Sequence, residues 1–263
     1  MDAHTDPVAH NRAAWDKQVD DSNEWTRPVG LDVIERARNG DWSVVLIGYV
    51  PVKRHWFPGD LHGVDILCLA SGGGQQGPVL AAAGANITVF DNSPKQLERD
   101  EMVAKREGLA IKTALGDMRD LSEFGDASFD LVFNPVSNLF SPELGPVWRE
   151  CYRVLRPGGS LLTGFLNPDI YIFDPEPLDA RGELTVRYAI PYSDVADRTP
   201  AEQEQFPGKD APLEYSHTLT EQLNGQLQAG FVLQAFEEAP HHGNATKDYM
   251  PGYFATRALK PAP

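Results

Sequence analysis

The sequence predicts an α/β fold, organised around one strand–turn–helix–strand unit of the kind that binds nucleotides. An apolar run at 64–70, broken only by Asp65, has the length of a strand buried on both faces. Three consecutive glycines at 72–74 follow this run, and an Ala- and Leu-rich helix at 78–83 leads to a second apolar run at 87–90. A strand–helix–strand crossover joins parallel strands, so we expect a mostly parallel sheet.

Asp91 ends the second apolar run, 19 residues after Gly72. An acid about 20 residues after such glycines is placed to accept hydrogen bonds from both hydroxyls of a ribose. The glycines let the backbone approach a ligand closely, and the helix start adds positive partial charge. The pattern G-x-G-x-x-G is met only by Gly72, Gly74 and Gly77, and a lone glycine match is weak evidence. The unit therefore predicts a nucleotide site without defining the class of enzyme.

The other elements follow from periodicity and from helix start and stop signals. Helices are predicted at 8–21 and about 31–38, followed by an apolar run at 42–50 and an aromatic patch at 55–57. Later predictions comprise helices at 94–107, 143–155 and 218–229, and strands at 110–115, 129–133, 159–166, 231–236 and 253–259. In the first of these helices, the residues around Asp100 mix apolar and acidic character, as expected for a half-exposed helix.

Residues 167–216 lose clear periodicity and are rich in Pro, Asp and Glu. About fifty such residues inside a compact domain usually form a functional insertion. Within this insertion, residues 184–190 (LTVRYAI) alternate between apolar and polar and predict an additional strand.

Five segments resemble motifs of the class I S-adenosylmethionine-dependent methyltransferases, in the order and at the spacing of that family. They are LCLASGGG, the acid in ITVFDNS, GDMRDL at 116–121, FDLVFNP at 129–135 and RVLRPGGSLL at 153–162. The resemblance covers roughly residues 64–166. RVLRPGG is the most specific motif, because in this family a helix ends in that tight turn before the fifth strand, and Rossmann dehydrogenases have no equivalent.

The resemblance implies a Rossmann-like sheet of seven mostly parallel strands, in the order 3-2-1-4-5-7-6 with one antiparallel strand, and with helices on both faces. Residues 1–60 are expected to form a helical and aromatic cap, and residues 61–263 the methyltransferase domain, with the insertion at 167–216 as its substrate region. In open α/β sheets the ligand lies over the carboxyl ends of the strands.

The resemblance also implies the cofactor S-adenosylmethionine, with S-adenosylhomocysteine as its product. The turn at 70–74 would pass under the methionine half, Asp91 would bind the ribose, Asp117 and the Met118 backbone the adenine, and Asn134 would lie near the transferred methyl. The predicted cofactor-binding residues are Ala70, Ser71, Gly72, Gly73, Gly74, Gln75, Asp91, Asn92, Ser93, Gly116, Asp117, Met118 and Asn134.

The sequence departs from the family pattern at two positions. The family's first motif usually carries an acid two residues before its first glycine, where this chain has Cys68, and Ala70 replaces that glycine. Another group must then hold the charged end of the cofactor. Ser71, the two glutamines at 75–76 and the loop around Thr26 are candidates.

The acceptor pocket is expected between the cap and the insertion, because methyl transfer requires that water be excluded from the reacting pair. Its candidate residues are Trp25, Trp56, Phe57, Asn138 and Tyr188, with Tyr171, Phe173 and Tyr192 as further aromatics of the insertion. No catalytic residue is assigned. His55, His217 and Tyr215 could act as a general base if the acceptor must lose a proton, although residues of these types are more often hydrogen-bonded structural residues.

Composition limits the partners. The chain has 23 Lys and Arg against 38 Asp and Glu, a net charge of −15, which repels phosphate backbones and disfavours a nucleic-acid partner. No signal-peptide pattern and no apolar run near ~18 residues is present, and two cysteines make no disulfide framework. No metal site is predicted, since the pair at 241–242 lacks a third ligand nearby. We expect a cytoplasmic protein with a small-molecule substrate and no membrane or nucleic-acid partner.

The main hypothesis is methyl transfer from S-adenosylmethionine to an unidentified, small acceptor. An alternative is a protein that binds this cofactor without catalysis, as a sensor or scaffold; the departures at Cys68 and Ala70 keep it open. A weaker alternative is an NAD(P)-dependent oxidoreductase on the same nucleotide-binding unit, which the loose glycine pattern and RVLRPGG disfavour.

Overall fold

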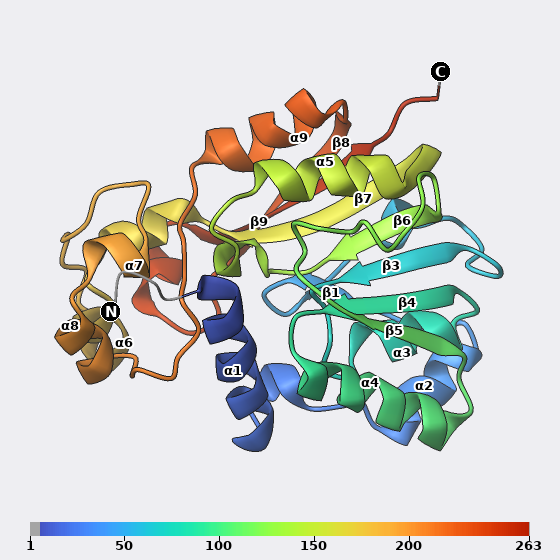
Figure 1. Cartoon of the computed structure of the whole chain (residues 1–263), viewed down its shortest axis with the longest axis horizontal. Helices are drawn as coiled ribbons and strands as arrows, with labels where there is room; N and C mark the ends of the chain where they lie inside the picture. The colour runs from blue at the N-terminus through green and yellow to red at the C-terminus, as the bar shows by residue number, and fades with distance from the viewer. Residues whose placement is uncertain (1–5, 263) are drawn as a thin grey trace.

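The computed structural model describes residues 6–262, and its centre is one seven-stranded sheet (Figure 1). The strands lie in the order β5-β4-β3-β6-β7-β9-β8. Because β1 and β2 form a separate hairpin, β3 is the first strand of this sheet, and the order in sheet numbering is 3-2-1-4-5-7-6, as predicted. Strand β9 runs in the opposite direction to the other six strands of this sheet. The strands are β3 (Asp65–Leu69), β4 (Asn86–Asp91), β5 (Ile111–Leu115), β6 (Phe129–Asn134), β7 (Leu155–Leu166), β8 (Val232–Pro240) and β9 (Pro251–Leu259).

Helices cover both faces of the sheet (Figure 1). One layer comprises α2 (Leu31–Arg38), α3 (Gln76–Ala82) and α4 (Pro94–Glu107), and the other comprises α5 (Gly145–Val154) and α9 (Gly225–Ala229). Strand β3 shows why both layers are needed: Ile66 and Cys68 pack into one apolar cluster, and Leu67 and Leu69 pack into the other. All four side chains are fully buried, as expected for a central parallel strand.

Helix α4 illustrates how local sequence defines an element. Ser93 accepts a hydrogen bond from the Gln96 amide as the N-cap, and Pro94 occupies the first turn, where its missing N–H is no loss. Gly108 ends the helix in the left-handed conformation. The predicted bounds, 94–107, are therefore confirmed.

Residues 116–128, between β5 and β6, form turns. The predicted helix at 218–229 is present, with the π-helical η5 (Thr220–Asn224) leading into α9. One expectation about secondary structure is wrong. The predicted strand at 184–190 is reduced to a single bridge between Phe173 and Val186, because no neighbouring strand is available to continue the pairing.

Only part of the N-terminal segment forms a cap. Helix α1 (Pro7–Asp20) and the short helix η1 (Glu24–Thr26) lie over the carboxyl ends of the strands, whereas α2 packs beside α3. The hairpin of β1 (Val45–Ile47) and β2 (Val50–Pro51) lies directly on β7: a Cβ on Gly164 would be 2.2 Å from the carbonyl oxygen of Leu46. Residues 1–5 of the predicted cap lie outside the described residues.

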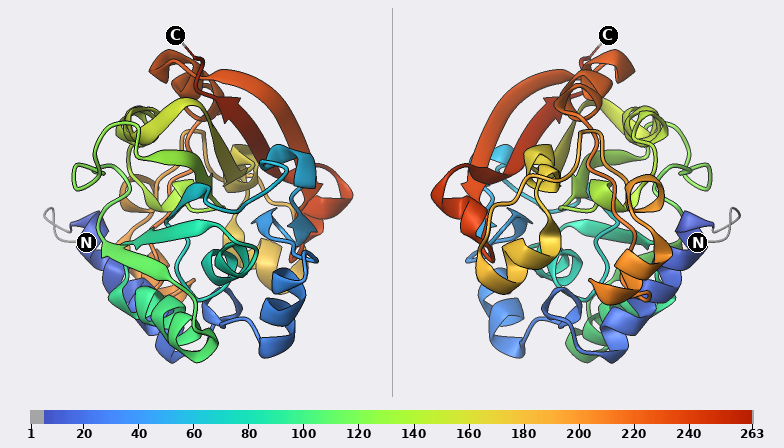
Figure 2. Two further views of the ribbon diagram at one scale, coloured as in Figure 1. Left: turned by 90° about the vertical axis from the view of Figure 1, so that its right-hand side faces the viewer. Right: turned by 90° about the vertical axis from the view of Figure 1, so that its left-hand side faces the viewer.

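The insertion lies beside α1 at the same end of the molecule (Figures 1 and 2). The Asn11 side chain of α1 donates to the Leu213 carbonyl oxygen and accepts from the Leu213 amide, and Lys17 pairs with Asp210. The insertion consists of short helices joined by irregular segments: η4 (Pro168–Ile172), α6 (Pro175–Arg181), α7 (Asp194–Asp197) and α8 (Pro200–Gln205). Within residues 6–262, no helix has both the length and the apolar character that a membrane crossing requires.

Candidate cofactor and acceptor site

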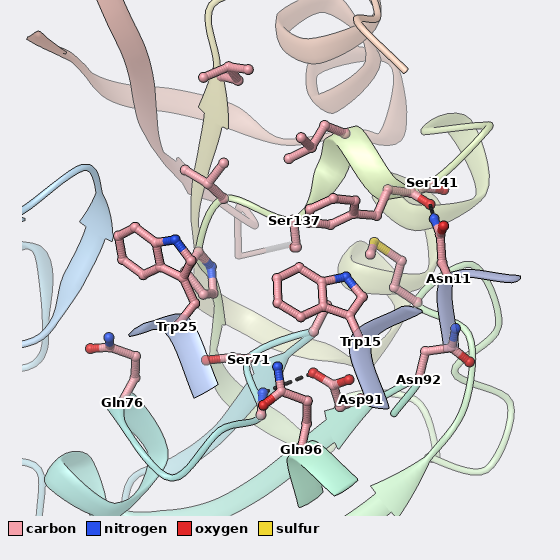
Figure 3. Close-up of a pocket in the computed structure, with 18 of the residues that line it drawn as sticks. Asn11, Trp15, Trp25, Ser71, Gln76, Asp91, Asn92, Gln96, Ser137 and Ser141 are labelled. Carbon is pink, nitrogen blue, oxygen red and sulfur yellow. Dashed lines mark hydrogen bonds between the residues drawn. The ribbon is translucent and has the colours of Figure 1, made fainter. Parts of the chain in front are cut away.

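A cavity of about 370 Å³ lies over the carboxyl ends of the strands, within the usual size of ligand sites (Figure 3). The sheet contributes its floor, and α1, η1, the β1–β2 hairpin, the tail of the insertion and the loop at 241–242 contribute its cover. Its wall includes Asn11, Trp15, Trp25, Ala70, Ser71, Gly72, Gln75, Asp91, Asn92, Gln96, Gly116, Asp117, Met118, Ser137, Glu214, His241, His242 and Tyr253.

The glycine turn after β3 is held by two carboxylates. The Gly72 amide donates to Asp91 Oδ2 over 2.9 Å, and the Gly73 and Gly74 amides donate to Asp100 Oδ2 over 2.9 and 3.1 Å. Gly73 and Gly74 have φ angles of 113° and 72°, which side chains rarely adopt. All three amides of the glycine run therefore point at acids of the protein, and the turn offers no free N–H cluster for a pyrophosphate.

Asp100 is a site residue that the sequence analysis missed. It was expected on a half-exposed helix, but its side chain is fully buried. Burial raises its pKa to about 8, with the charge of Asp91 adding to the rise and the two glycine amides opposing it. Its neighbours Leu97 and Val103 are also buried, so the three-residue spacing of this face was the signal that could have placed Asp100 in the interior.

Asp91 lies at the end of β4 with its carboxylate on the cavity wall (Figure 3). Oδ1 accepts from the Ser93 amide and Oδ2 from the Gly72 amide, each over 2.9 Å, which leaves lone pairs on both oxygens for a ligand. Burial raises its pKa, and the backbone donors oppose that rise. Ser93 itself is fully buried, caps α4 and donates to Asp16, so it supports the wall without lining it.

Helix α1 closes the end of the cavity near β4 and β5. Asn92 accepts from Arg12 and donates to the carbonyl oxygen of Val8, which ties the helix to the strand end. Asp117, on the wall, is paired with Arg119 over 2.6 Å. Gly116 is required here because a Cβ would lie 2.3 Å from the Phe90 ring.

Asn134 and Asn138 were expected to contact cofactor and substrate, but the structure places them in a buried hydrogen-bond network. Asn134 donates to the Leu69 carbonyl oxygen and to Ser137 Oγ, and accepts from Thr163 Oγ1. Asn138 donates to Gln222 Oε1 over 3.1 Å. Both side chains are fully buried and neither lines the cavity, although their neighbour Ser137 does.

Of the five substrate-pocket candidates, only Trp25 lines the cavity. Trp56 and Phe57 lie in the core on the α3 face of the sheet, where the Phe57 ring stacks on that of Phe133 at 6.1 Å. Tyr188 packs against Tyr192 inside the insertion, with ring centroids 4.9 Å apart. Aromatic residues suit a core as well as a pocket, so composition alone placed these three wrongly.

The three candidate bases do not reach the cavity wall. His55 is exposed on η2 (Arg54–Trp56), and Tyr215 is half-buried outside the cavity. His217 is buried, its Nε2 lies 2.8 Å from the Ser141 carbonyl oxygen, and burial lowers its pKa. The neighbour of Tyr215, Glu214, does line the cavity, and it is the only residue of the insertion that does so within the described wall.

Several other wall residues were not predicted. Trp15 of α1 meets Phe140 of η3 (Asn138–Phe140) edge to face at 5.1 Å. His241 and His242, expected in a solvated loop, stack on Tyr253 with ring centroids 5.3 and 5.8 Å away. Burial and the neighbouring His242 lower the pKa of His241 to about 4, so this imidazole is neutral at pH 7.

Metal-binding side chains do not cluster in residues 6–262: no three His, Cys, Asp or Glu lie close enough to share an ion. Cys68 and Cys151 are free thiols, both buried on opposite faces of the sheet.

The strand order, the glycine turn and the cavity over the strand ends define a class I S-adenosylmethionine-dependent methyltransferase. The chain belongs to this family. A family model described as "Methyltransferase domain" matches residues 67–163. The uncharacterized methyltransferase YbaJ of Bacillus subtilis (strain 168) is 47% identical over 253 residues, which cover 96% of this chain and 98% of YbaJ.

Solved structures share the fold. An S-adenosylmethionine-dependent methyltransferase from Mesorhizobium loti is 21% identical with a TM-score of 0.59, over 78% of this chain and 94% of that one. The [4+2]-cyclase SpnF is 20% identical with a TM-score of 0.57, over 94% and 97% of the two chains. A methyltransferase and a cyclase on one fold show that the reaction must be argued from the site.

Proposed function

We propose that this protein transfers the methyl group of S-adenosylmethionine to a small-molecule acceptor inside the cavity. The observation that supports the proposal is a single cavity with two features: carboxylates hold the glycine turn on one side, and aromatic side chains cover the other. The division into a cap at 1–60 and a catalytic domain at 61–263 remains part of the proposal, with α1 and η1 as the covering part of the cap. A cytoplasmic location is also proposed, supported by two free, buried thiols.

The cavity wall fits S-adenosylmethionine rather than a dinucleotide. Ser71 and Gln96 line the wall, and Ser71 Oγ and Gln96 Oε1 are buried without a hydrogen-bond partner in residues 6–262. Such atoms require a partner, so we expect both side chains to turn toward the polar groups of a bound cofactor. The described wall carries Asp91, Asp117 and Glu214 but no Lys or Arg, which suits a sulfonium and disfavours the diphosphate of NAD(P).

The residues have separate roles in this proposal. Asp91 would hold the ribose through charge-assisted hydrogen bonds, with Asn92, Gly116 and Met118 beside the base and the turn at 70–72 under the methionine half. Asp100 fixes the glycine turn from the opposite side without lining the cavity.

Catalysis by the protein would rest on alignment. The cofactor supplies a methyl group that its sulfonium already makes electrophilic. The wall residues hold acceptor and methyl in line, and such orientation contributes up to about 7–11 kcal/mol. Trp15 and Trp25 cover the strand ends (Figure 3) and exclude water from the reacting pair.

The cover also argues for a small acceptor. Segments from α1, η1, the insertion and the 241–242 loop all reach the wall, so a macromolecule could not enter without displacing them. The net charge of −15 further disfavours nucleic acid.

Calorimetry with S-adenosylmethionine, S-adenosylhomocysteine and NADH tests cofactor choice. We expect binding of both sulfur compounds and none of NADH; tight NADH binding alone would overturn the proposal. Methyl-labelled cofactor incubated with the low-mass fraction of a cell extract tests catalysis. Label in a new small product supports the enzyme, whereas binding without any transfer supports the sensor or scaffold.

A further inference from the structure

The end of the cavity farthest from β5 has its own polar group. It lies over β6, β7 and β9: Leu139 follows β6, Leu166 ends β7, and Tyr253 pairs with Leu166 across the sheet. Glu214 is held there because the next residue, Tyr215, donates its amide to the Leu139 carbonyl oxygen. Asp91 ends β4 and Asp117 follows β5, so Glu214 lies beyond the part assigned to the cofactor's nucleoside.

The Glu214 carboxylate is held in one orientation. Oε2 accepts from the Tyr171 hydroxyl over 2.8 Å, and the Glu214 amide donates to Asp194 Oδ2 over the same distance. The Tyr171 and Tyr192 rings stack at 5.3 Å, and Tyr192 donates to Asp194. The tyrosines expected to line the acceptor pocket therefore orient the acid that lines it.

Glu214 is a carboxylate on the wall without a cationic partner. Among the described residues it forms no ion pair, and Oε1 makes no hydrogen bond, whereas Asp117 is paired with Arg119. Arg198, a buried cation of the insertion, lies 3.9 Å from Asp194. An unpaired acid in a partly desolvated cavity favours a cationic ligand.

Aromatic rings face the same end. Trp25, His242 and Tyr253 lie on the wall, with Trp25 edge-on to His242 at 5.6 Å and the Tyr253 hydroxyl 2.8 Å from His242 Nδ1. The faces of Trp and Tyr rings attract an ammonium group. Carboxylate and rings together form a cation site.

We propose that the acceptor is a primary or secondary amine, bound as its ammonium ion between Glu214 and these rings, and that Glu214 takes the proton that frees the nitrogen lone pair. The proposal rests on the proposed methyl transfer. The ammonium N–H bond breaks and its proton goes to Glu214; the lone pair forms the bond to the methyl carbon, and the electrons of the breaking C–S bond stay on sulfur. The methylated ammonium leaves, and Glu214 returns its proton to water.

The acidity of Glu214 suits this role. Burial and the charge of Asp194 raise its pKa to about 7, with a smaller rise from Asp179, whereas the Tyr171 hydrogen bond and Arg198 oppose the rise. A base works best when its pKa lies near the working pH.

Paired probes test the amine site. We would titrate benzylamine and benzyl alcohol into the protein saturated with S-adenosylhomocysteine. The wild type should bind the amine about tenfold more tightly, a difference of about 1.4 kcal/mol. Glu214→Gln should abolish this preference, since the amide can still accept from Tyr171 but carries no charge. Equal binding of both probes, or no amine binding at millimolar concentration, would overturn the proposal.

Tyr171→Phe is the matched control. It keeps the carboxylate and so should keep the amine preference, but loss of the hydrogen bond raises the Glu214 pKa further. Amine affinity in the wild type should rise with pH through about 7, and this rise should move to higher pH in Tyr171→Phe. An unmoved profile would contradict the assignment of the titration to Glu214.

The affinity for S-adenosylhomocysteine separates this proposal from the proposed function. Glu214→Gln should retain that affinity within about twofold, which also reports that the variant is folded. A tenfold loss would show that Glu214 holds the cofactor's own ammonium group and would overturn the amine site. Failure of the wild type to bind the cofactor would instead refute the proposed function.

Discussion

At the scale of single residues, Asp91 and Asp100 both hold the glycine turn, but only Asp91 lines the cavity. The burial of Asp100 differs from what the sequence indicates, because an acid on a helix is normally exposed. The role of Asp91 was predictable from its spacing to the glycines. The role of Asp100 becomes visible only when α4 is packed against the glycine turn. The two acids therefore make separable predictions.

Replacing Asp91 with Asn should weaken binding of S-adenosylhomocysteine at least tenfold while leaving the protein folded. The amide can still accept from one backbone donor, but it loses the charge, and a charged hydrogen bond contributes about 1.5–3 kcal/mol. Glu98→Gln, at an exposed acid of α4, is the matched control and should bind normally. Calorimetry measures both, and an unchanged dissociation constant for Asp91→Asn would place the ribose elsewhere.

Asp100 should make stability depend on pH. Its folded-state pKa is about 8, above the usual value for an aspartate, so the folded protein keeps a proton that the unfolded chain releases. The stabilisation that comes from this retained proton is fully present below about pH 4 and is lost as pH rises through about 8. Asp100→Asn mimics the protonated acid. In urea unfolding from pH 5 to 9, the gap between the free energies of unfolding of variant and wild type should favour the variant and should widen as pH rises. A constant gap would contradict the raised pKa.

At the scale of elements, α1 is fixed over the cavity by Asn11, which makes three hydrogen bonds to Phe140 and Leu213 and is buried. Asn11→Ala should destabilise the protein by about 1–3 kcal/mol, because it leaves backbone groups unpaired. Lys17→Ala removes an exposed ion pair between the same elements, which solvent screens, so its effect on stability should be much smaller. Chemical unfolding measures the free energy of unfolding of both variants. Equal losses of stability would show that Asn11 does not anchor α1.

The hairpin of β1 and β2 gives a steric test of a second element. A Cβ at position 164 would meet the Leu46 carbonyl oxygen at 2.2 Å, so Gly164→Ala should displace the hairpin and cost about 1–3 kcal/mol. Gly59→Ala adds the same methyl where no atom lies within 4 Å and should be close to neutral. Thermal unfolding of the two variants checks the contact, and a neutral Gly164→Ala would mean that the hairpin lies off β7.

At the scale of the whole molecule, the sheet and the segments that cover it were predictable, but most of the side chains that line the cavity from this cover were not. Strands such as β3 carry long apolar runs between glycine turns, and the motif order fixes their neighbours. Residues 42–57 and the insertion lie outside these motifs, so Trp56 and Tyr188 gave no signal that separates core from cavity wall. Which side chains line the cavity depends on how α1, the insertion and the 241–242 loop dock together, and that contact is between segments far apart in sequence.

These segments should respond together when cofactor binds. Residues 8–26, 211–217 and 241–253 meet over one cavity, and the first two segments share hydrogen bonds between Asn11 and Leu213. Binding of S-adenosylhomocysteine should therefore slow amide exchange in all three, whereas α2 and α6, which do not line the cavity, should exchange as before. Trp25→Ala should weaken this shared protection and impair turnover more than cofactor affinity, because the Trp25 ring covers the cavity from η1 while Asp91 remains in place. Protection confined to the glycine turn and Asp91 would show that the cover does not close over the bound cofactor.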